Sequence, residues 1–590
     1  MKQVFGIMSA MKRKIPYGIM NWAEVVRECY FVDSTAYIRA LEDVKTPVFL
    51  RPKRFGKSLW CSMLGYYYDV NCKDRFDELF GRTEIGRDPT PLANAFLVLT
   101  FDFSTVQVGT VREIEAWFFE NVKRSVSYLT VKYAHLADWS SVMSAGNPAD
   151  MIAAVRSVIR DNGLPPLYVI IDEYDNFTNE LVVSRRDAEY DAICGHDADA
   201  TRESFFKAFF KSFKAGLADG TVGRTYFTGV LPITLDDLSS GFNVGTVVSL
   251  NPDLLGMVGF SQSQLERYVE EIYADRGFDR ANLPDVLADL KAFYDGYRFL
   301  PGAEPLYNAT ICNWYLFNLV SEKGAQPTLV LDANVRTDVG WIRRLAGGAA
   351  NALARVKAYV ERGEGEDASR SGLAAKFGRA KFFSEDFFPY ALYYLGLLTF
   401  ENAFTLGIPN LTVRNMFVDY YDELSAFRNE DEARRNFVGA AKRLALDGGT
   451  WRELFEQFWI HYVKARLPAQ AFDQVNENFF RTTFASRTWD VLPMYYSVET
   501  EYNTPEGRCD FLAVPKPGLA KPAMLVEFKY FTGAEADRRH LLGRAEPDAE
   551  TAAQASRYRA SLFRRPGWNH PVEAAVVEVC GSRGYNWFDV

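Results

Sequence analysis

The sequence predicts an α/β protein of several domains, and three local patterns support that fold class. A short apolar run at Thr46–Leu50 leads into a glycine-containing loop, after which apolar residues recur at helical spacing. The run Leu167–Ile171 is continuously apolar, as expected for a strand covered on both faces of a parallel sheet. Residues 507–531 contain two strand-like segments around a turn rich in Pro, Gly and Lys, which predicts a hairpin.

The composition of the 590 residues is that of a globular protein with packed cores, at 48% hydrophobic and 24% charged residues. No apolar run approaches the roughly 18 residues that a membrane-spanning helix needs, and the N-terminus lacks the apolar core of a signal peptide. Seven cysteines without a C-x-x-C pair indicate neither a disulfide framework nor a zinc site, and they favour a reducing cytoplasm. The net charge of −9 gives no overall signal for nucleic-acid binding.

Residues 51–58, which we call the phosphate loop, read RPKRFGKS and match the end of the pattern G-x-x-x-x-G-K-[ST]. Arg51 stands where that pattern has its first glycine, and Pro52 offers another way to fix the turn because its φ is locked near −65°. In such a loop, backbone N–H groups hold phosphates, Lys57 reaches the β- and γ-phosphates, and Ser58 binds Mg²⁺. The alternative is a basic strand-to-helix turn without a ligand. The predicted nucleotide contacts of this segment are Arg54, Phe55, Gly56, Lys57, Ser58 and Leu59.

Two acids follow the apolar run that ends at Ile171, at the strand edge where open α/β sheets bind ligands. Asp172 is predicted to hold Mg²⁺, and Glu173 to orient and deprotonate the attacking water. The alternative is an acidic turn that caps the next helix. A further strand at Gly223–Val230 places Thr228 near its end, as a candidate that senses the γ-phosphate, although threonine at a strand end is also common for packing reasons.

The second strand of the C-terminal hairpin carries a charged pair on one face. Alternation along Met524–Tyr530 puts Glu527 and Lys529 on the same side, and Asp510 on the neighbouring strand can lie beside Glu527. Two carboxylates and a lysine suit phosphodiester cleavage, because hard oxygen ligands bind Mg²⁺ and the metal lowers the pKa of a bound water. The pattern alone is weak, since an exposed, salt-bridged hairpin gives the same spacing.

Predicted helices flank this hairpin. The upstream helix carries Glu477, and the downstream helix places Gln554 and Tyr558 on one face at i, i+4. Between the two regions with chemical motifs, residues 361–372 are charged and rich in Gly and Ser, which predicts an exposed loop.

Several segments together resemble bacterial AAA-ATPase-like proteins that carry a C-terminal nuclease of the PD-(D/E)XK type. They include RPKRFGKS and YVIIDEYDNF, together with the order of helix, hairpin with D…E-x-K, and helix near the C-terminus. The Arg-Pro start of the loop is typical of that family, whereas Ser34 departs from it, because such proteins usually have lysine there. We therefore expect a P-loop NTPase parallel-sheet domain at 1–249, a mostly helical, winged-helix-like middle region at 250–449, and a PD-(D/E)XK nuclease-like α/β domain at 450–590.

The resemblance also implies roles for six residues of the C-terminal domain: metal ligation by Asp510 and Glu527, catalysis by Lys529, an accessory acid at Glu477, and secondary contacts by Gln554 and Tyr558. It implies ATP and Mg²⁺ as cofactors. Nucleic acid, with DNA expected, is the implied partner, and assembly into a nucleotide-dependent homo-oligomer is open.

Three functions are compatible with these features. The first is an ATP-dependent enzyme that cuts nucleic acid, and the sequence favours it because both sites keep their charged residues. The second is a signalling-type ATPase switch whose nuclease fold binds nucleic acid or protein without cleaving it. The third is a nuclease whose nucleotide domain is only structural.

Overall fold

The structure is a computed structural model that divides into two compact units. Unit 1 holds the described residues up to Leu411 apart from 355 and 359, and unit 2 holds those two residues and the described chain from Thr412 to Val590. The described residues are 12–194, 203–234, 244–327, 339–348, 355, 359, 366–368, 373, 377–414, 416–417, 430–465, 467, 472, 475–492, 495–516, 519, 521–564, 568 and 570–590.

Unit 1 is built on a five-stranded parallel sheet with the strand order β2-β3-β4-β1-β5. Every residue of β1 and β3 is buried, as the apolar runs predicted. Because β4 lies between β1 and β3, the carboxyl ends of these three strands meet at one edge of the sheet. The strands are β1 (Pro47–Leu50), β2 (Leu97–Asp102), β3 (Leu167–Asp172), β4 (Val222–Gly229) and β5 (Thr246–Val247).

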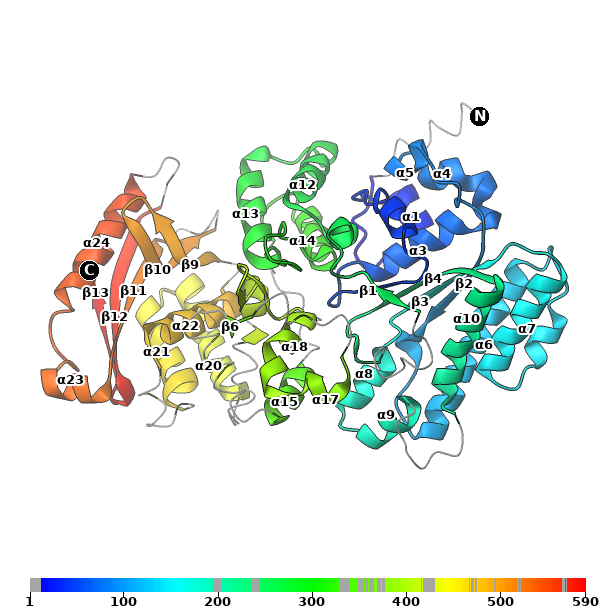
Figure 1. The fold of residues 1–590 in the computed structure, drawn as a ribbon. Helices are drawn as coiled ribbons and strands as arrows, with labels where there is room; N and C mark the ends of the chain where they lie inside the picture. Colours follow the sequence, from blue (N-terminus) through cyan, green and yellow to red (C-terminus); the bar gives the residue numbers. More distant parts are fainter. Residues whose placement is uncertain are drawn as a thin grey trace. The chain divides into compact units, whose positions relative to one another are not determined.

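Helices cover both faces of this sheet (Figure 1). On one face, α3 (Lys57–Tyr68) packs against β2 and β3, with the backbone of Gly65 close to Val98 and Ile170. On the other, α10 (Phe205–Asp219) buries a stripe of phenylalanines, and its Phe209 meets Phe101 edge-on. The same layer contains α6 (Val111–Lys132) and α7 (Pro148–Asp161). Shorter helices of the region are α1 (Trp22–Glu28), α2 (Tyr37–Glu42), α4 (Phe76–Phe80), α5 (Glu84–Arg87), α8 (Asn176–Val183) and α9 (Asp187–Cys194).

The middle of the chain is mostly helical, as predicted. Its helices are α12 (Gln262–Arg276), α13 (Leu283–Tyr294), α14 (Ala309–Ser321), α15 (Val339–Gly348), α17 (Arg379–Phe382) and α18 (Phe388–Tyr394). A small antiparallel sheet, ordered β6-β8-β7, consists of β6 (Glu366–Asp367), which precedes α17, and of β7 (Thr399–Phe400) and β8 (Thr405–Gly407), which follow α18. The loop predicted at 361–372 lies outside the described residues except for 366–368, of which two form β6.

Unit 2 contains a mixed five-stranded sheet with the order β13-β12-β11-β10-β9, in which only β11 and β12 run parallel. The strands are β9 (Tyr496–Thr504), β10 (Gly507–Pro515), β11 (Ala523–Phe531), β12 (Val572–Cys580) and β13 (Tyr585–Asp589). The helices are α20 (Glu430–Lys442), α21 (Trp451–Phe458), α22 (Glu477–Val491), α23 (Gly533–Arg539) and α24 (Ala549–Phe563).

The two faces of β11 are covered by different helices, as the predicted alternation requires (Figure 1). Leu525 packs with Tyr558 and other buried residues of α24. Phe528 contacts Phe484 of α22 and Phe455 of α21. The predicted fold class, with a parallel-sheet domain, a helical middle and a C-terminal α/β domain, is therefore confirmed.

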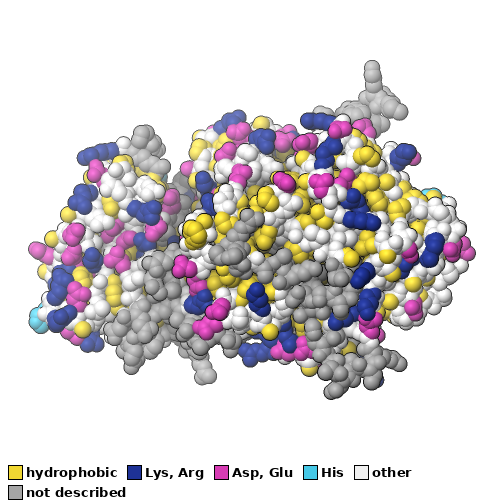
Figure 2. All heavy atoms as spheres, viewed as in Figure 1, with side chains coloured by type: hydrophobic (Ala, Val, Ile, Leu, Met, Phe, Trp, Pro, Cys, Tyr) yellow, Lys and Arg dark blue, Asp and Glu magenta, His cyan; other side chains and the backbone are white. Residues whose placement is uncertain are grey.

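The charge of the surface and the apolar character of the helices indicate which partners, nucleic acid or membrane, the protein could bind. Acidic and basic side chains are intermixed over the face of the molecule in Figure 2, without one dominant sign. None of the helices in the described part of the chain combines the length and the apolar character that crossing a bilayer requires.

The aromatic cluster under α10 provides a test of the packing. Phe209 is fully buried and contacts Phe101, Phe103, Phe118 and Phe213. We expect Phe209→Ala to lower the free energy of unfolding by about 3–5 kcal/mol, because a large cavity remains in a packed core. Phe404→Ala removes a ring that is 72% exposed and should change it by less than about 0.5 kcal/mol. Equal urea midpoints for the two variants, followed by circular dichroism, would contradict this packing.

Candidate functional site

The phosphate loop joins the end of β1 to the first turn of α3. Arg54 and Gly56 have φ values of 73° and 95°, so the loop makes two left-handed steps just before the helix begins at Lys57. The ammonium group of Lys57 is buried and donates to the carbonyl oxygens of Arg51 at 3.1 Å and Pro52 at 3.0 Å. Burial lowers the pKa of Lys57, and the nearby carboxylates of Glu173 and Asp172 act in the opposite direction.

Arg51 has a structural role that sequence reasoning missed. Its side chain is only 2% exposed, and its guanidinium donates to the carbonyl oxygens of Leu50 at 3.0 Å, Ser249 at 2.8 Å and Leu255 at 3.2 Å. The same group lies over the rings of Phe49 and Phe299, 4.4 and 4.0 Å from their centres. Burial lowers the pKa of Arg51 to about 10. The residue that replaces the usual glycine therefore anchors the loop to the segment at 249–255.

Two further elements of unit 1 bind the outer side of the phosphate loop. The backbone N–H of Thr310, at the start of α14, donates to the carbonyl of Arg54 at 3.0 Å, and that of Gly259 donates to the carbonyl of Phe55 at 3.1 Å. The Asn308 side chain donates to the carbonyl of Lys53 at 3.3 Å. With its carbonyl groups held in this way, the loop can present N–H groups to a ligand.

The acids at the end of β3 lie beside the loop. The Ser58 hydroxyl hydrogen-bonds the carboxylate of Asp172; burial raises the pKa of Asp172, while Ser58 and Lys57 oppose that shift. Glu173 adopts a left-handed conformation with φ 50°, and its N–H donates to Asp172 at 3.1 Å. Burial raises the pKa of Glu173 as well. Non-glycine residues in this conformation are strained and cluster at functional sites, so Lys57, Ser58, Asp172 and Glu173 form one candidate centre.

Two other polar residues near this centre have structural partners. Asp175 is fully buried, and its carboxylate accepts the N–H groups of Val230 and Leu231, the latter at 2.7 Å. The sequence signal for it was the third acid of the IDEYD segment. Thr228 is also buried, and its hydroxyl donates to the carbonyl of Phe49 at 2.8 Å, which joins β4 to β1. In this structure the hydroxyl faces the sheet, and the sensing role of Thr228 stays a prediction.

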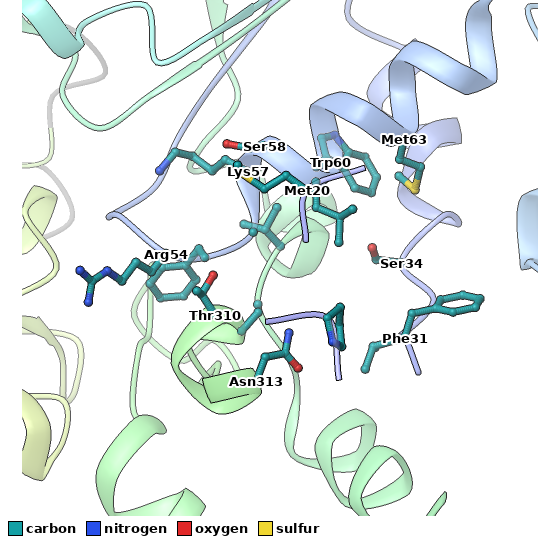
Figure 3. A pocket seen from close by; sticks show the side chains of 18 of the residues that line it. Met20, Phe31, Ser34, Arg54, Lys57, Ser58, Trp60, Met63, Thr310 and Asn313 are labelled. Carbon is teal, nitrogen blue, oxygen red and sulfur yellow. The ribbon is translucent and has the colours of Figure 1, made fainter. Parts of the chain in front are cut away.

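A cavity of about 300 Å³ opens next to the phosphate loop (Figure 3). Phe55, Gly56, Lys57, Ser58, Leu59 and Glu173 line its phosphate end. Its other walls come from the N-terminal segment, including Phe31 and Ser34, and from Asn313 of α14, whose amide points into the cavity (Figure 3). The Tyr268 hydroxyl donates to the Asn313 carbonyl oxygen at 3.1 Å and so orients the amide. Ser34, the departure from the family pattern, thus lies in the wall of this cavity.

In unit 2, β10 and β11 separate at the two predicted metal ligands. Their ladder ends with the pair Phe511 and Val526, and Asp510 and Glu527 are the next residues on each strand. The N–H of Asp510 donates to Glu527 Oε1 at 3.0 Å, and the N–H of Phe528 donates to Asp510 Oδ2 at 2.9 Å. Each carboxylate therefore takes a backbone donor from the opposite strand, and the two acids fill the fork between the strands.

The other predicted residues of the C-terminal domain surround this fork. Gln554 donates to Glu527 Oε2 at 3.2 Å and to the Tyr558 hydroxyl at 3.0 Å. Burial and then the charge of Asp510 raise the pKa of Glu527. Burial and then Asp510 also raise the pKa of Glu477, and Lys529 opposes that shift. The structure thus brings all six predicted residues together around one position.

Sequence reasoning missed Arg481 and Glu501 at the same site. Arg481 donates to Asp510 Oδ1 at 2.8 Å and to Glu501 Oε1 at 2.7 Å. The available signal was helical spacing, because Arg481 follows Glu477 by four residues on α22 and therefore shares its face.

Both centres offer oxygen donors of the kind that Mg²⁺ prefers. Among the residues that the structure describes, no group of three or more His, Cys, Asp or Glu side chains is arranged as a metal centre. Magnesium needs fewer protein ligands, because it keeps several waters and takes one or two carboxylates together with phosphate oxygens. The hard oxygen donors of Asp510 with Glu527, and of Ser58 with Asp172, fit that requirement.

The fold and these two centres define a P-loop protein of the parallel-sheet class whose second unit has a nuclease-like sheet. Residues 16–239 match the family model described as Predicted AAA-ATPase, and residues 475–584 match that of the PD-(D/E)XK nuclease superfamily. Comparisons with curated proteins and with solved structures give no match. The chain therefore joins a predicted AAA-ATPase-like domain to a PD-(D/E)XK nuclease superfamily domain, which confirms the resemblance seen in the sequence.

Restoring the usual glycine of the phosphate loop tests the anchoring role of Arg51. We expect Arg51→Gly to destabilise unit 1 by at least about 3 kcal/mol, because three carbonyl groups lose a charged donor, and to weaken binding of a fluorescent ATP analogue. Lys53→Gly, a second change within the loop, serves as the control for added flexibility. Thermal unfolding and analogue titration measure both effects, and an Arg51→Gly protein as stable as wild type would contradict the anchor.

Proposed function

We propose that the protein binds and hydrolyses ATP with Mg²⁺ in unit 1 and cleaves nucleic acid with Mg²⁺ in unit 2, with DNA as the expected substrate. The observation that supports this most strongly is the fork in which Asp510 and Glu527 lie side by side, close to Lys529 and Glu477. A fold that only binds a partner has no use for buried acids held against each other, which is an energetically costly arrangement.

In unit 1 the proposed work is divided among four side chains. Lys57 exchanges the carbonyl groups of Arg51 and Pro52 for the β- and γ-phosphates, and Ser58 with Asp172 holds Mg²⁺. Glu173 orients the attacking water and accepts its proton, and its raised pKa makes it a stronger base than an exposed glutamate. Bound Mg²⁺ supplies charge stabilisation on the phosphate oxygens.

The base end of the cavity favours adenine over guanine. Guanine presents two neighbouring N–H donors on its pairing edge, for which a carboxylate is the best partner, whereas adenine presents one donor and one acceptor, which an amide can match. Asn313 supplies such an amide, and the acid of the cavity lining, Glu173, lies at the phosphate end. Apolar side chains such as Ile19, Met20 and Phe31 provide a surface for the base.

In unit 2 the chain holds and orients the reacting groups. Asp510 and Glu527 provide the metal ligands, and bound Mg²⁺ supplies a lowered water pKa and charge stabilisation on the phosphate. Lys529 positions the nucleophile, and Glu477 acts as an accessory acid. Gln554, itself bonded to Tyr558, fixes the orientation of the Glu527 carboxylate from α24.

We also propose the cytoplasm as the cellular location of the protein. All seven cysteines are buried, and the sequence has no C-x-x-C pair, which suits a reducing cytoplasm. Domain boundaries at 249 and 449 and a nucleotide-dependent homo-oligomer belong to the same proposal, and a size measurement with and without an ATP analogue tests the oligomer.

A matrix of cleavage and ATPase assays tests both activities. Plasmid and single-stranded DNA are incubated with Mg²⁺, with and without ATP, for wild type, Lys57→Ala and Asp510→Ala. We expect Lys57→Ala to lose ATP turnover and Asp510→Ala to lose cleavage, each by at least about 100-fold. Lys73→Ala and Asp537→Ala remove exposed charges from the same units and serve as controls.

The outcomes of this matrix separate the alternatives. Cleavage that Lys57→Ala retains without ATP supports a nuclease whose nucleotide domain is structural. ATP turnover with no cleavage under any condition contradicts the nuclease proposal. It supports instead a signalling-type ATPase switch whose nuclease fold binds without cutting.

Base selectivity gives a separate test. Competition against a fluorescent ATP analogue should show ATP binding at least about tenfold more tightly than GTP, a difference of about 1.4 kcal/mol. Asn313→Leu, which has the same branching but no amide, should remove most of that preference and leave competition by inorganic triphosphate unchanged. Equal affinity of the wild type for ATP and GTP would show that the amide does not read the base.

A further inference from the structure

Arg481 is held against the predicted metal ligand by more than one bond. Its side chain is 14% exposed and lies between Asp510 and Glu501, bonded to Asp510 Oδ1 at 2.8 Å and to Glu501 Oε1 at 2.7 Å. It also donates to the side chain of Asn478, one turn earlier on α22. A guanidinium can contact these groups simultaneously because its donors form a rigid planar fork.

Glu501 has an unusual backbone for a residue in a strand. It lies on β9 between the residues that pair with Cys509 and Phe511, directly across from Asp510. Its φ is 53°, a left-handed conformation that is rare for a non-glycine residue. This local irregularity directs the Glu501 carboxylate toward Arg481, and such irregularities near active sites commonly re-aim a side chain.

The partners of the four carboxylate oxygens differ in kind. Asp510 Oδ2 and Glu527 Oε1 accept backbone N–H groups, and Glu527 Oε2 accepts the Gln554 amide. Asp510 Oδ1 is bonded to the charged guanidinium of Arg481. The first three donors are neutral and are compatible with a metal on the remaining lone pairs, whereas a guanidinium and a divalent cation on one oxygen repel each other.

We propose that Arg481 is a displaceable counter-ion of the metal centre and becomes a phosphate-binding residue when the centre is loaded. It neutralises Asp510 until Mg²⁺ binds there. Glu501 then retains the guanidinium at the edge of the site, where the N–H groups released from Asp510 donate to the non-bridging oxygens of the nucleic-acid phosphate. This inference rests on the proposed nuclease site of unit 2, and it couples metal loading to substrate binding.

The first part of the proposal, that Arg481 competes with Mg²⁺ for Asp510, is tested without any cleavage assay. Isothermal titration of Mg²⁺ is carried out on the full chain for wild type, Arg481→Gln and Arg508→Gln, with Asp510→Ala identifying the heat that belongs to this site. We expect Arg481→Gln to bind Mg²⁺ at least about tenfold more tightly, because its competitor is gone. Arg508 is the matched control, since it contacts Glu501 at 3.3 Å with a side chain that is 59% exposed, and its loss should change the affinity by less than about threefold.

The second part of the proposal, that Arg481 binds the substrate phosphate, is tested by measuring oligonucleotide binding in the presence of Ca²⁺. This ion occupies oxygen sites and is expected to slow turnover. We expect Arg481→Gln to bind at least about tenfold more weakly than wild type, and Arg481→Lys to fall between them, because lysine keeps the charge without the planar fork.

Mg²⁺ affinity in Arg481→Gln that equals or falls below wild type overturns the proposal, as does unchanged oligonucleotide binding. Circular dichroism checks folding, and Arg481→Met, which also removes the charge but keeps an unbranched side chain, provides the same metal readout if the glutamine variant is unfolded. A wild type that never cleaves would end the proposed nuclease function, while the metal titration would still decide the role of Arg481.

Discussion

Both candidate sites depend on one constraint, which is that a charged group taken out of water needs polar partners at close range. In this chain the backbone supplies many of them. The guanidinium of Arg51 is held by carbonyl oxygens, and the carboxylates of Asp175, Asp510 and Glu527 are held by N–H groups. Because backbone groups cannot move without moving the chain, each of these bonds also fixes a loop or a strand end, and the positions of the reactive side chains follow from it.

The elements were largely predictable because their signals are local. The buried strands β1 and β3 follow from continuous apolar runs, and the two faces of β11 follow from alternation. The candidate residues Lys57, Ser58, Asp172 and Glu173 were predictable because parallel strands end at a common edge. In the same way, Asp510 and Glu527 follow from the antiparallel hairpin.

What the sequence could not supply were partners distant along the chain. Arg51 looked like a replacement for a turn-forming glycine because two of the three carbonyl groups that bind it lie far along the chain, at Ser249 and Leu255, which are 198 and 204 positions away. The left-handed backbone of Glu501 could not be predicted from its residue type, because glycine or asparagine is the usual residue in that conformation. The hydroxyl of Thr228 turns toward β1 because β4 lies between β1 and β3, a strand order that the residues alone did not give.

The way in which the phosphate loop is held sets the smallest fragment in which the loop keeps its hydrogen-bond partners. The family match to the ATPase-like region ends at residue 239, yet the loop is bonded to Ser249, Leu255, Gly259, Asn308 and Thr310. A fragment cut at the family boundary would leave the guanidinium of Arg51 in an apolar setting without two of its three acceptors. The hydrogen bonds that hold the loop therefore reach past the proposed boundary at 249, as far as the first turn of α14 (Ala309–Ser321), so hydrogen bonding and sequence similarity give different limits for this part of unit 1.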